Sequence, residues 1–178
     1  MSIATVASRY AKSLIELAKE KGVVEEVYKD MVLFSQTAAE NRILMKVLGS
    51  PVVRHEKKLG ILKGLFEDKV NPVSFSIFNI ITKKNREAIL DAIANEFVKL
   101  YDDYRGIQKA TVISSAPLTA EARQHFIETL SKATGKTIEL TEKVDETLIG
   151  GYILTVGDKQ VDASLRSQLN ALKIKLAS

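Results

Sequence analysis

The period of the apolar residues changes near residue 106, and this change restricts the folds that the chain can adopt. Up to that point apolar side chains recur every three or four residues, as Leu90, Ile93 and Phe97 do, which is the period of an α-helix. Beyond it, short β-branched segments indicate strands. We therefore expect an α-helical N-terminal six-helix bundle over residues 1–105, followed by a small α+β C-terminal domain over residues 106–178.

Residues that begin and end helices divide the first domain. Gly22 follows a run of charged residues and is expected to end the first helix. Asn41, Ser50 and Asn71 are good N-cap residues, and the last two each precede a proline, which suits the first position of a helix. Because the connections are short, neighbouring helices should pack as a bundle. The expected helices cover residues 3–21, 23–40, 42–48, 51–68, 72–84 and 86–105.

The second domain combines strands with two helices. Thr119 is expected to cap a helix that Gly135 ends, and the apolar residues Phe126, Ile127 and Leu130 should face inward. A final helix should follow the last strand and carry one apolar face. The expected strands cover residues 110–115, 137–140, 151–156 and 159–161, and the apolar face of the final helix consists of Leu165, Leu169, Leu172 and Leu176.

Composition limits the core and the chemistry. Aromatic residues make up 6% of the chain and tryptophan is absent, so the core is expected to be aliphatic. The absence of cysteine excludes disulfides, thiolate metal sites and a cysteine nucleophile. His55-Glu56 resembles the start of a zinc-protease motif, but Leu59 stands where the second histidine is required. No phosphate-binding loop and no nucleophile with a neighbouring base is present. We expect no enzyme activity, no metal and no cofactor.

Charge and hydropathy give little sign of a nucleic-acid or membrane partner. Residues 1–105 hold 17 basic and 14 acidic residues, a net +3, and the rest hold 9 and 8, a net +1. The densest basic cluster lies around Arg54 and Lys57, includes a glutamate and has no aromatic neighbours, so a solvated helix face is the better interpretation. No apolar stretch approaches the length of a membrane span, and no secretory signal precedes the first helix. We expect a cytoplasmic protein without direct membrane insertion.

Two of the expected helices have wider apolar faces than one core requires. In the first helix, a ridge that includes Tyr10 and Leu14 adjoins a strip of alanines, and together they cover about 180°. In the fifth helix the apolar arc covers about 160°. One interpretation is that both helices are central in the bundle. The other is an apolar groove between them that accepts an amphipathic helix from a partner.

Two segments of the chain resemble a known family. Residues 8–14, Ser-Arg-Tyr-Ala-Lys-Ser-Leu, are similar to the opening helix of the delta subunit of bacterial F-type ATP synthases, called the oligomycin-sensitivity-conferring protein in mitochondria. The second segment is more specific: residues 144–153 contain an acidic residue and a Leu-Ile-Gly-Gly run, and residues 161–166 give an Asp-small-Ser helix start. Many members have glycine where this chain has Ala163.

The resemblance implies a non-catalytic connector in the peripheral stalk, attached to the cytoplasmic side of the inner (plasma) membrane through other subunits. The six-helix domain would bind the N-terminal helix of one alpha subunit, and the second domain would meet the C-terminal region of the b subunit. Such a connector keeps the catalytic head from turning with the rotor during proton-driven ATP synthesis. The residues expected to line the groove for the alpha subunit are Ala7, Tyr10, Ala11, Leu14, Ile77, Phe78 and Ile81.

The C-terminal motif is expected to determine the local fold. Gly150 and Gly151 permit unusual backbone torsions where a strand begins, and Asp162 or Ser164 should begin the last helix. Asp145 is the acidic residue of the family's signature. Three other functions remain open from the residues alone: a general helix-binding adaptor, a helical nucleic-acid-binding module suggested by the basic isoelectric point, and a small hydrolase or transferase whose catalytic cluster is missing.

Overall fold

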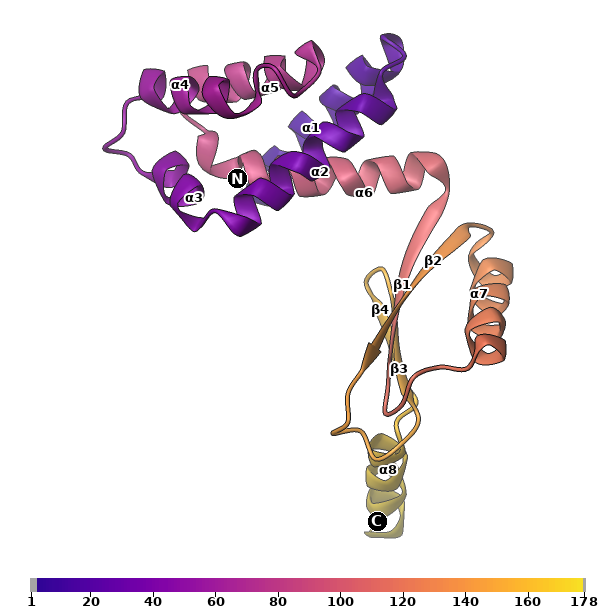
Figure 1. Ribbon diagram of the computed structural model, residues 1–178. Helices are drawn as coiled ribbons and strands as arrows, with labels where there is room; N and C mark the ends of the chain where they lie inside the picture. The colour runs from indigo at the N-terminus through magenta and orange to yellow at the C-terminus, as the bar shows by residue number, and fades with distance from the viewer. Residues whose placement is uncertain (1–2, 178) are drawn as a thin grey trace. The chain divides into compact units, whose positions relative to one another are not determined.

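A computed structural model describes the backbone of residues 3–177 and the side chains of residues 3–174 (Figure 1). The chain forms two compact units, one ending at Asp102 and the other beginning at Asp103. None of the described helices is both long and apolar enough to cross a bilayer. The predicted fold class is confirmed: a helical bundle precedes an α+β unit built on a four-stranded sheet.

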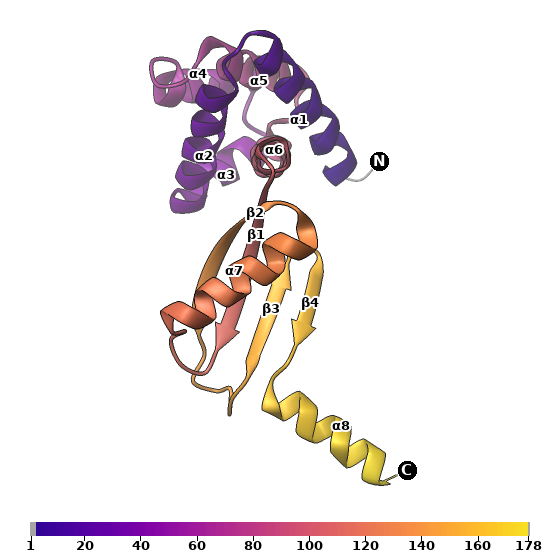
Figure 2. The same cartoon turned by 90° about the vertical axis from the view of Figure 1, so that its right-hand side faces the viewer.

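The helical unit is arranged around its last helix. Figure 2 shows α6 viewed along its axis, with the other helices around it. This position explains why Leu90, Ile93, Ala94, Phe97 and Tyr101 of α6 are all buried. A short 3₁₀ turn, Glu87–Ile89, precedes α6. The helices are α1 (Ile3–Glu20), α2 (Val24–Glu40), α3 (Arg42–Gly49), α4 (His55–Phe66), α5 (Pro72–Lys83) and α6 (Leu90–Arg105).

The predicted helix boundaries at Gly22, Asn41 and Asn71 are confirmed. Gly22 adopts a left-handed conformation with φ of +68°. The Asn41 side chain accepts hydrogen bonds from the backbone N–H groups of Ile43 and Leu44, and the Asn71 side chain accepts one from Val73 at 2.9 Å. These bonds satisfy donors that the first turn of a helix leaves unpaired.

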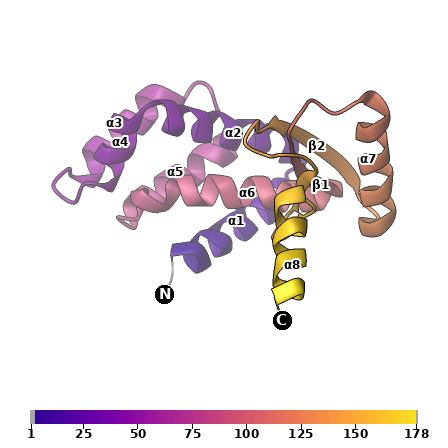
Figure 3. The same ribbon diagram turned by 90° about the horizontal axis from the view of Figure 1, so that it is seen from below.

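The predicted start of the fourth helix at residue 51 is wrong, because α4 begins at His55. Ser50 instead follows the end of α3 in an extended conformation, and Arg54 is extended as well. Two β-branched residues, Val52 and Val53, lie between them, and such residues disfavour a helix. Figures 1 and 3 show this connection as an open loop at the edge of the helical unit.

The core of the helical unit is less aliphatic than its composition predicts. The rings of Phe34, Phe66 and Phe78 meet at its centre, with centroid separations between 5.0 and 5.8 Å. All three rings are at most 2% exposed, as is Phe97. Four of the six phenylalanines of the chain are therefore fully buried in this core, where each ring removes a large apolar surface from water.

The second unit is a mixed sheet covered by one helix. The strand order is β2-β1-β3-β4, with β1 and β2 parallel and the other pairs antiparallel. Helix α7 lies across one face of the sheet (Figure 2), where Phe126 packs edge-on against Tyr152. The elements are β1 (Ile107–Ser114), α7 (Ala120–Thr134), β2 (Thr137–Val144), β3 (Tyr152–Val156), β4 (Lys159–Asp162) and α8 (Leu165–Ala177).

The covered face of the sheet carries a thin core. Alternate residues Ala110, Val112 and Ser114 of β1 are buried, as expected for a strand with one face packed. Phe126, Ile127 and Leu130 of α7 point the predicted way but remain half-buried, and α7 has no fully buried side chain. The predicted caps of this helix are confirmed, since Thr119 accepts a hydrogen bond from the Ala122 N–H and Gly135 has φ of +68°.

Candidate functional site

Six of the seven residues expected to line a groove on α1 and α5 lie in the core of the helical unit. Their side chains are at most 7% exposed, because α1 and α5 pack on each other and on α2, and α5 also packs on α4. For these residues, a central position in the bundle is what the structure shows, and direct contact with a partner would require the helices to separate. Tyr10 alone is half-buried. The buried six are Ala7, Ala11, Leu14, Ile77, Phe78 and Ile81.

The apolar side chains of α1 that reach the surface lie one strip away from the buried ones. Ile3 is 65% exposed, and Val6, Tyr10 and Leu17 pack partly against the core. At 100° per residue these four side chains fall within an arc of about 60°. They form a continuous edge strip along α1, next to the buried face.

A shallow hollow of about 240 Å³ opens beside this strip. Val6 and Tyr10 supply its apolar surface. Arg9, Ser13 and Arg86 supply polar edges, and Arg86 comes from the segment after α5. Val6 and these three residues were not among those predicted to line a groove. The hollow therefore offers an apolar seat with a basic edge, and contains no pair of groups that could act as acid and base.

The Gly150-Gly151 motif joins the start of β3 to the start of α8. The carbonyl of Gly150 accepts a hydrogen bond from the Leu165 N–H, and the carbonyl of Tyr152 accepts one from the Ala163 N–H, both at 2.9 Å. A Cβ atom on Gly151 would lie only 2.3 Å from the Ala163 carbonyl oxygen. Gly151 also has φ of +81°. The glycine is required for this backbone crossing.

Asp162 and Ser164 together begin α8. The Asp162 carboxylate accepts hydrogen bonds from the Ser164 N–H at 2.9 Å and the Ser167 hydroxyl at 2.6 Å. Ser164, itself buried, accepts a hydrogen bond from the Ser167 N–H. The bonds from Ser167 and Ser164 hold the pKa of Asp162 below its usual 3.8.

Asp145 forms a similar turn before β3. Its carboxylate accepts hydrogen bonds from the Thr147 hydroxyl and the Thr147 N–H. These bonds, with a smaller contribution from the charge of Arg166, hold the pKa of Asp145 below 3.8. The family's acidic residue thus shapes the loop that leads to Gly150.

The two aspartates should make the stability of the second unit depend on pH in acid. A carboxylate whose pKa is lowered by folding stabilises the folded state above its unfolded pKa, and this contribution disappears as the pH falls through the lower, folded pKa. We expect the urea midpoint of the second unit to fall as the pH drops below about 4. Urea titrations followed by NMR signals of the sheet would measure it. Asp162→Asn should flatten the profile, and an unchanged profile would contradict the assignment.

Helix α8 exposes a row of large apolar side chains. Leu165, Leu169 and Leu172 are between 43% and 58% exposed, and the side chain of Leu176 lies outside the described residues. In the same unit Val161 is 56% exposed and Ile149 is 69% exposed. This row of exposed apolar side chains makes one face of α8 a candidate docking surface.

Within the described part of the chain, no group of three or more histidine or acidic side chains could hold a metal ion. The carboxylates of Asp145 and Asp162 accept hydrogen bonds from backbone N–H and hydroxyl groups that lie two to five residues later in the chain. These hydrogen bonds hold the local backbone of the motif.

Comparison with known proteins identifies the family. Residues 6–176 match the family described as ATP synthase delta (OSCP) subunit. ATP synthase subunit delta of Cytophaga hutchinsonii is 39% identical over 96% of this chain and 93% of the relative, and that of Salinibacter ruber is 38% identical over 99% and 93%. The chloroplastic delta subunit of Ochrosphaera neapolitana is 35% identical over 97% of both chains.

The fold has a counterpart among solved structures. One chain in the structure of the Toxoplasma gondii mitochondrial ATP synthase hexamer superposes with a TM-score of 0.73 over 97% of both chains, at 22% identity. This structural similarity is evidence for the fold alone, and the evidence for the family comes from the sequence matches. The chain therefore belongs to the ATP synthase delta (OSCP) subunit family, whose members are non-catalytic structural subunits of the peripheral stalk.

Proposed function

We propose that this protein joins the catalytic head to the stalk through two separate apolar surfaces, one on each unit. The edge strip of α1 binds the N-terminal helix of an alpha subunit. The apolar row of α8 binds the C-terminal region of the b subunit. The observation that carries the proposal is that each unit presents large apolar side chains at its surface along one helix. On α1 these are the exposed Ile3 and the half-buried Val6, Tyr10 and Leu17, and on α8 the exposed Leu165, Leu169 and Leu172.

The proposed role needs strong attachment at both ends. Torque from the rotor tends to turn the head, and a connector opposes this only while both interfaces hold. An amphipathic helix laid on an apolar strip buries area without requiring the precise geometry of catalysis. Fully burying one exposed large side chain contributes roughly 1.5–3 kcal/mol before the costs of ordering, and a side chain that is already half-buried contributes less.

The helical surface is tested with a charge on the edge strip. Val6→Asp places a carboxylate on the apolar side of the hollow and should weaken binding of a peptide from the N-terminus of the alpha subunit by about a hundredfold, roughly 2.7 kcal/mol. Titration calorimetry with the full chain measures it. Val52→Asp is the matched control, because Val52 is 88% exposed on the α3–α4 loop. Equal affinities for the two variants would refute the assignment of the strip.

The second surface is tested in the same way on α8. Leu169 is 58% exposed, so Leu169→Asp should leave the unit folded while weakening binding of a fragment from the C-terminal region of b at least tenfold, about 1.4 kcal/mol. Ile43→Asp on α3, where Ile43 is 73% exposed, is the control. Unchanged binding of this fragment by the Leu169 variant would show that α8 is not the stalk surface.

A further inference from the structure

The side chains that line the alpha-binding hollow include two basic residues and no acidic one. Arg9 comes from α1 and Arg86 from the segment after α5, and the nearest acidic residues in sequence, Glu16 and Glu87, do not line the hollow. The first turn of α1 also lacks an acidic residue, so the positive end of its helix dipole is not offset there. The chain as a whole is only +4, so this is a local concentration of positive charge.

Arg86 is the basic group that this chain leaves most available at the hollow. It reaches the hollow from the segment after α5, opposite Val6 and Tyr10 of α1. Its side chain has no hydrogen-bond or ion-pair partner among residues 3–177. The neighbouring carboxylate, Glu87, is 2% exposed and is paired with Lys58 at 3.3 Å, so it does not serve Arg86.

We propose that the helix docking on the edge strip of α1 is acidic as well as amphipathic, with a carboxylate that pairs with Arg86 while its apolar side chains contact Val6 and Tyr10. This inference rests on the proposed function and specifies the chemistry of its partner. A basic edge that includes Arg86 beside an apolar seat selects such a helix, because complementary charge speeds association and fixes register, and a basic helix would be repelled.

Binding of a synthetic peptide from the N-terminus of the alpha subunit to the full chain tests the inference. Arg86→Glu should weaken binding about tenfold in low salt, and Arg86→Gln should have a smaller effect. The loss should shrink near 1 M salt, where the Debye length is about 3 Å. Lys57→Glu makes the same charge change on α4 outside the hollow and should alter affinity less than about twofold. Replacing one peptide glutamate or aspartate by lysine should restore binding to the Arg86→Glu variant.

The possible outcomes separate the two proposals. If the peptide binds the wild-type chain but Arg86→Glu and Lys57→Glu weaken it equally, the pairing with Arg86 is overturned while the alpha-binding function stands. If no acidic position of the peptide rescues the Arg86→Glu variant, the pairing is likewise overturned. If the wild-type chain fails to bind the peptide at all, the proposed function itself is overturned, and the partner chemistry with it.

Discussion

Gly151→Ala should unfold the second unit while the helical unit stays folded. A Cβ atom at this position collides with the peptide unit that joins Ala163 to Ser164, at 2.3 Å from the Ala163 carbonyl oxygen and 2.9 Å from the Ser164 Cα atom. Backbone atoms cannot rotate away as a side chain does, so the start of α8 must separate from β3. The φ of +81° adds about 1 kcal/mol for any residue with a Cβ. We expect a loss of more than about 3 kcal/mol, which approaches the whole stability of a small unit.

Gly157→Ala is the matched control for this substitution. Gly157 also has positive φ, at +57°, but the nearest atom to an added Cβ is the Gln108 side-chain nitrogen at 3.5 Å. Only the torsional cost of about 1 kcal/mol is expected there. NMR spectra of each full-length variant, with urea titrations read separately for sheet and helical signals, measure the difference. Similar losses at the two glycines would mean that the close approach at Gly151 contributes nothing.

The sequence predicted that Gly150 and Gly151 have a structural role, but it did not predict how each of them contacts the rest of the unit. The two glycines were expected to permit unusual torsions, yet only Gly151 has a positive φ. At Gly150 the obstacle to a Cβ atom is the Leu165 side chain, with its Cδ1 at 2.7 Å. A pair of adjacent glycines indicates a backbone crossing, but the crossing segment lies more than ten residues further along the chain. Its distance from each glycine is a tertiary property that local sequence does not contain.

Helix boundaries were predictable where a single side chain determines them. Asn41, Asn71 and Thr119 each accept a hydrogen bond from a backbone N–H two or three residues later, which is a local interaction. Ser50 has the same capping chemistry and precedes a proline, yet it closes α3 instead of opening α4. The competing influence is the β-branched pair Val52-Val53, which favours an extended loop before His55.

The groove on α1 and α5 could not be placed from periodicity. The period gives the width of an apolar face but not the number of helices that cover it. The bundle itself buries Ala7, Ala11, Ile77 and Ile81. The apolar faces of α1 and α5 are therefore wide because several helices of the same unit pack against them. The edge strip of α1 nevertheless lies directly beside the residues predicted on that helix, and Tyr10 belongs to both sets.

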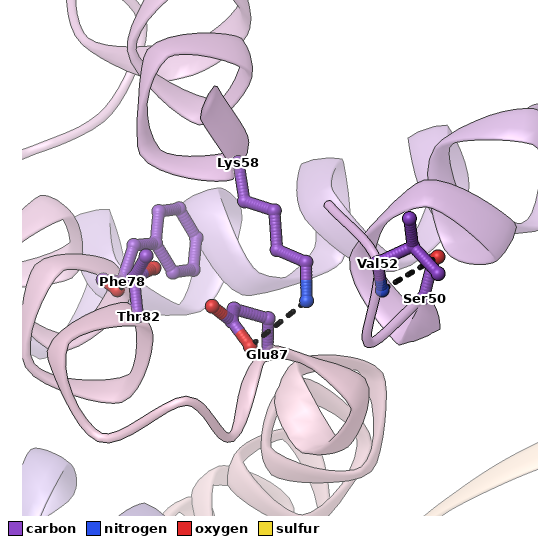
Figure 4. A network of polar contacts seen from close by, with 6 residues as sticks. All are labelled: Ser50, Val52, Lys58, Phe78, Thr82 and Glu87. Carbon is purple, nitrogen blue, oxygen red and sulfur yellow. Dashed lines mark hydrogen bonds and ion pairs between the residues drawn. The ribbon is translucent and has the colours of Figure 1, made fainter. Parts of the chain in front are cut away.

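Lys58→Met should destabilise the helical unit by about 3–5 kcal/mol, because it leaves a buried carboxylate without its counter-charge. Figure 4 shows the Lys58 ammonium directed at Glu87, with Phe78 and Thr82 nearby. The Nζ–Oε2 distance is 3.3 Å, and both residues are at most 6% exposed. The second carboxylate oxygen, Oε1, has no hydrogen-bond partner among the described residues. The lysine is therefore the main group that stabilises the charge of Glu87.

The double variant Lys58→Met/Glu87→Leu separates the cost of an orphaned charge from the value of the pair. Replacing both partners by apolar side chains of similar size is often neutral or stabilising, so most of the stability lost in Lys58→Met should return. Lys63→Met, which removes the exposed partner of Glu67 at 3.8 Å, should change the free energy of unfolding by less than about 0.5 kcal/mol. Urea denaturation of the three variants gives these values. A double variant no more stable than Lys58→Met would show that the pair itself contributes to the fold, because its removal would then cost at least as much as the burial of one unpaired charge.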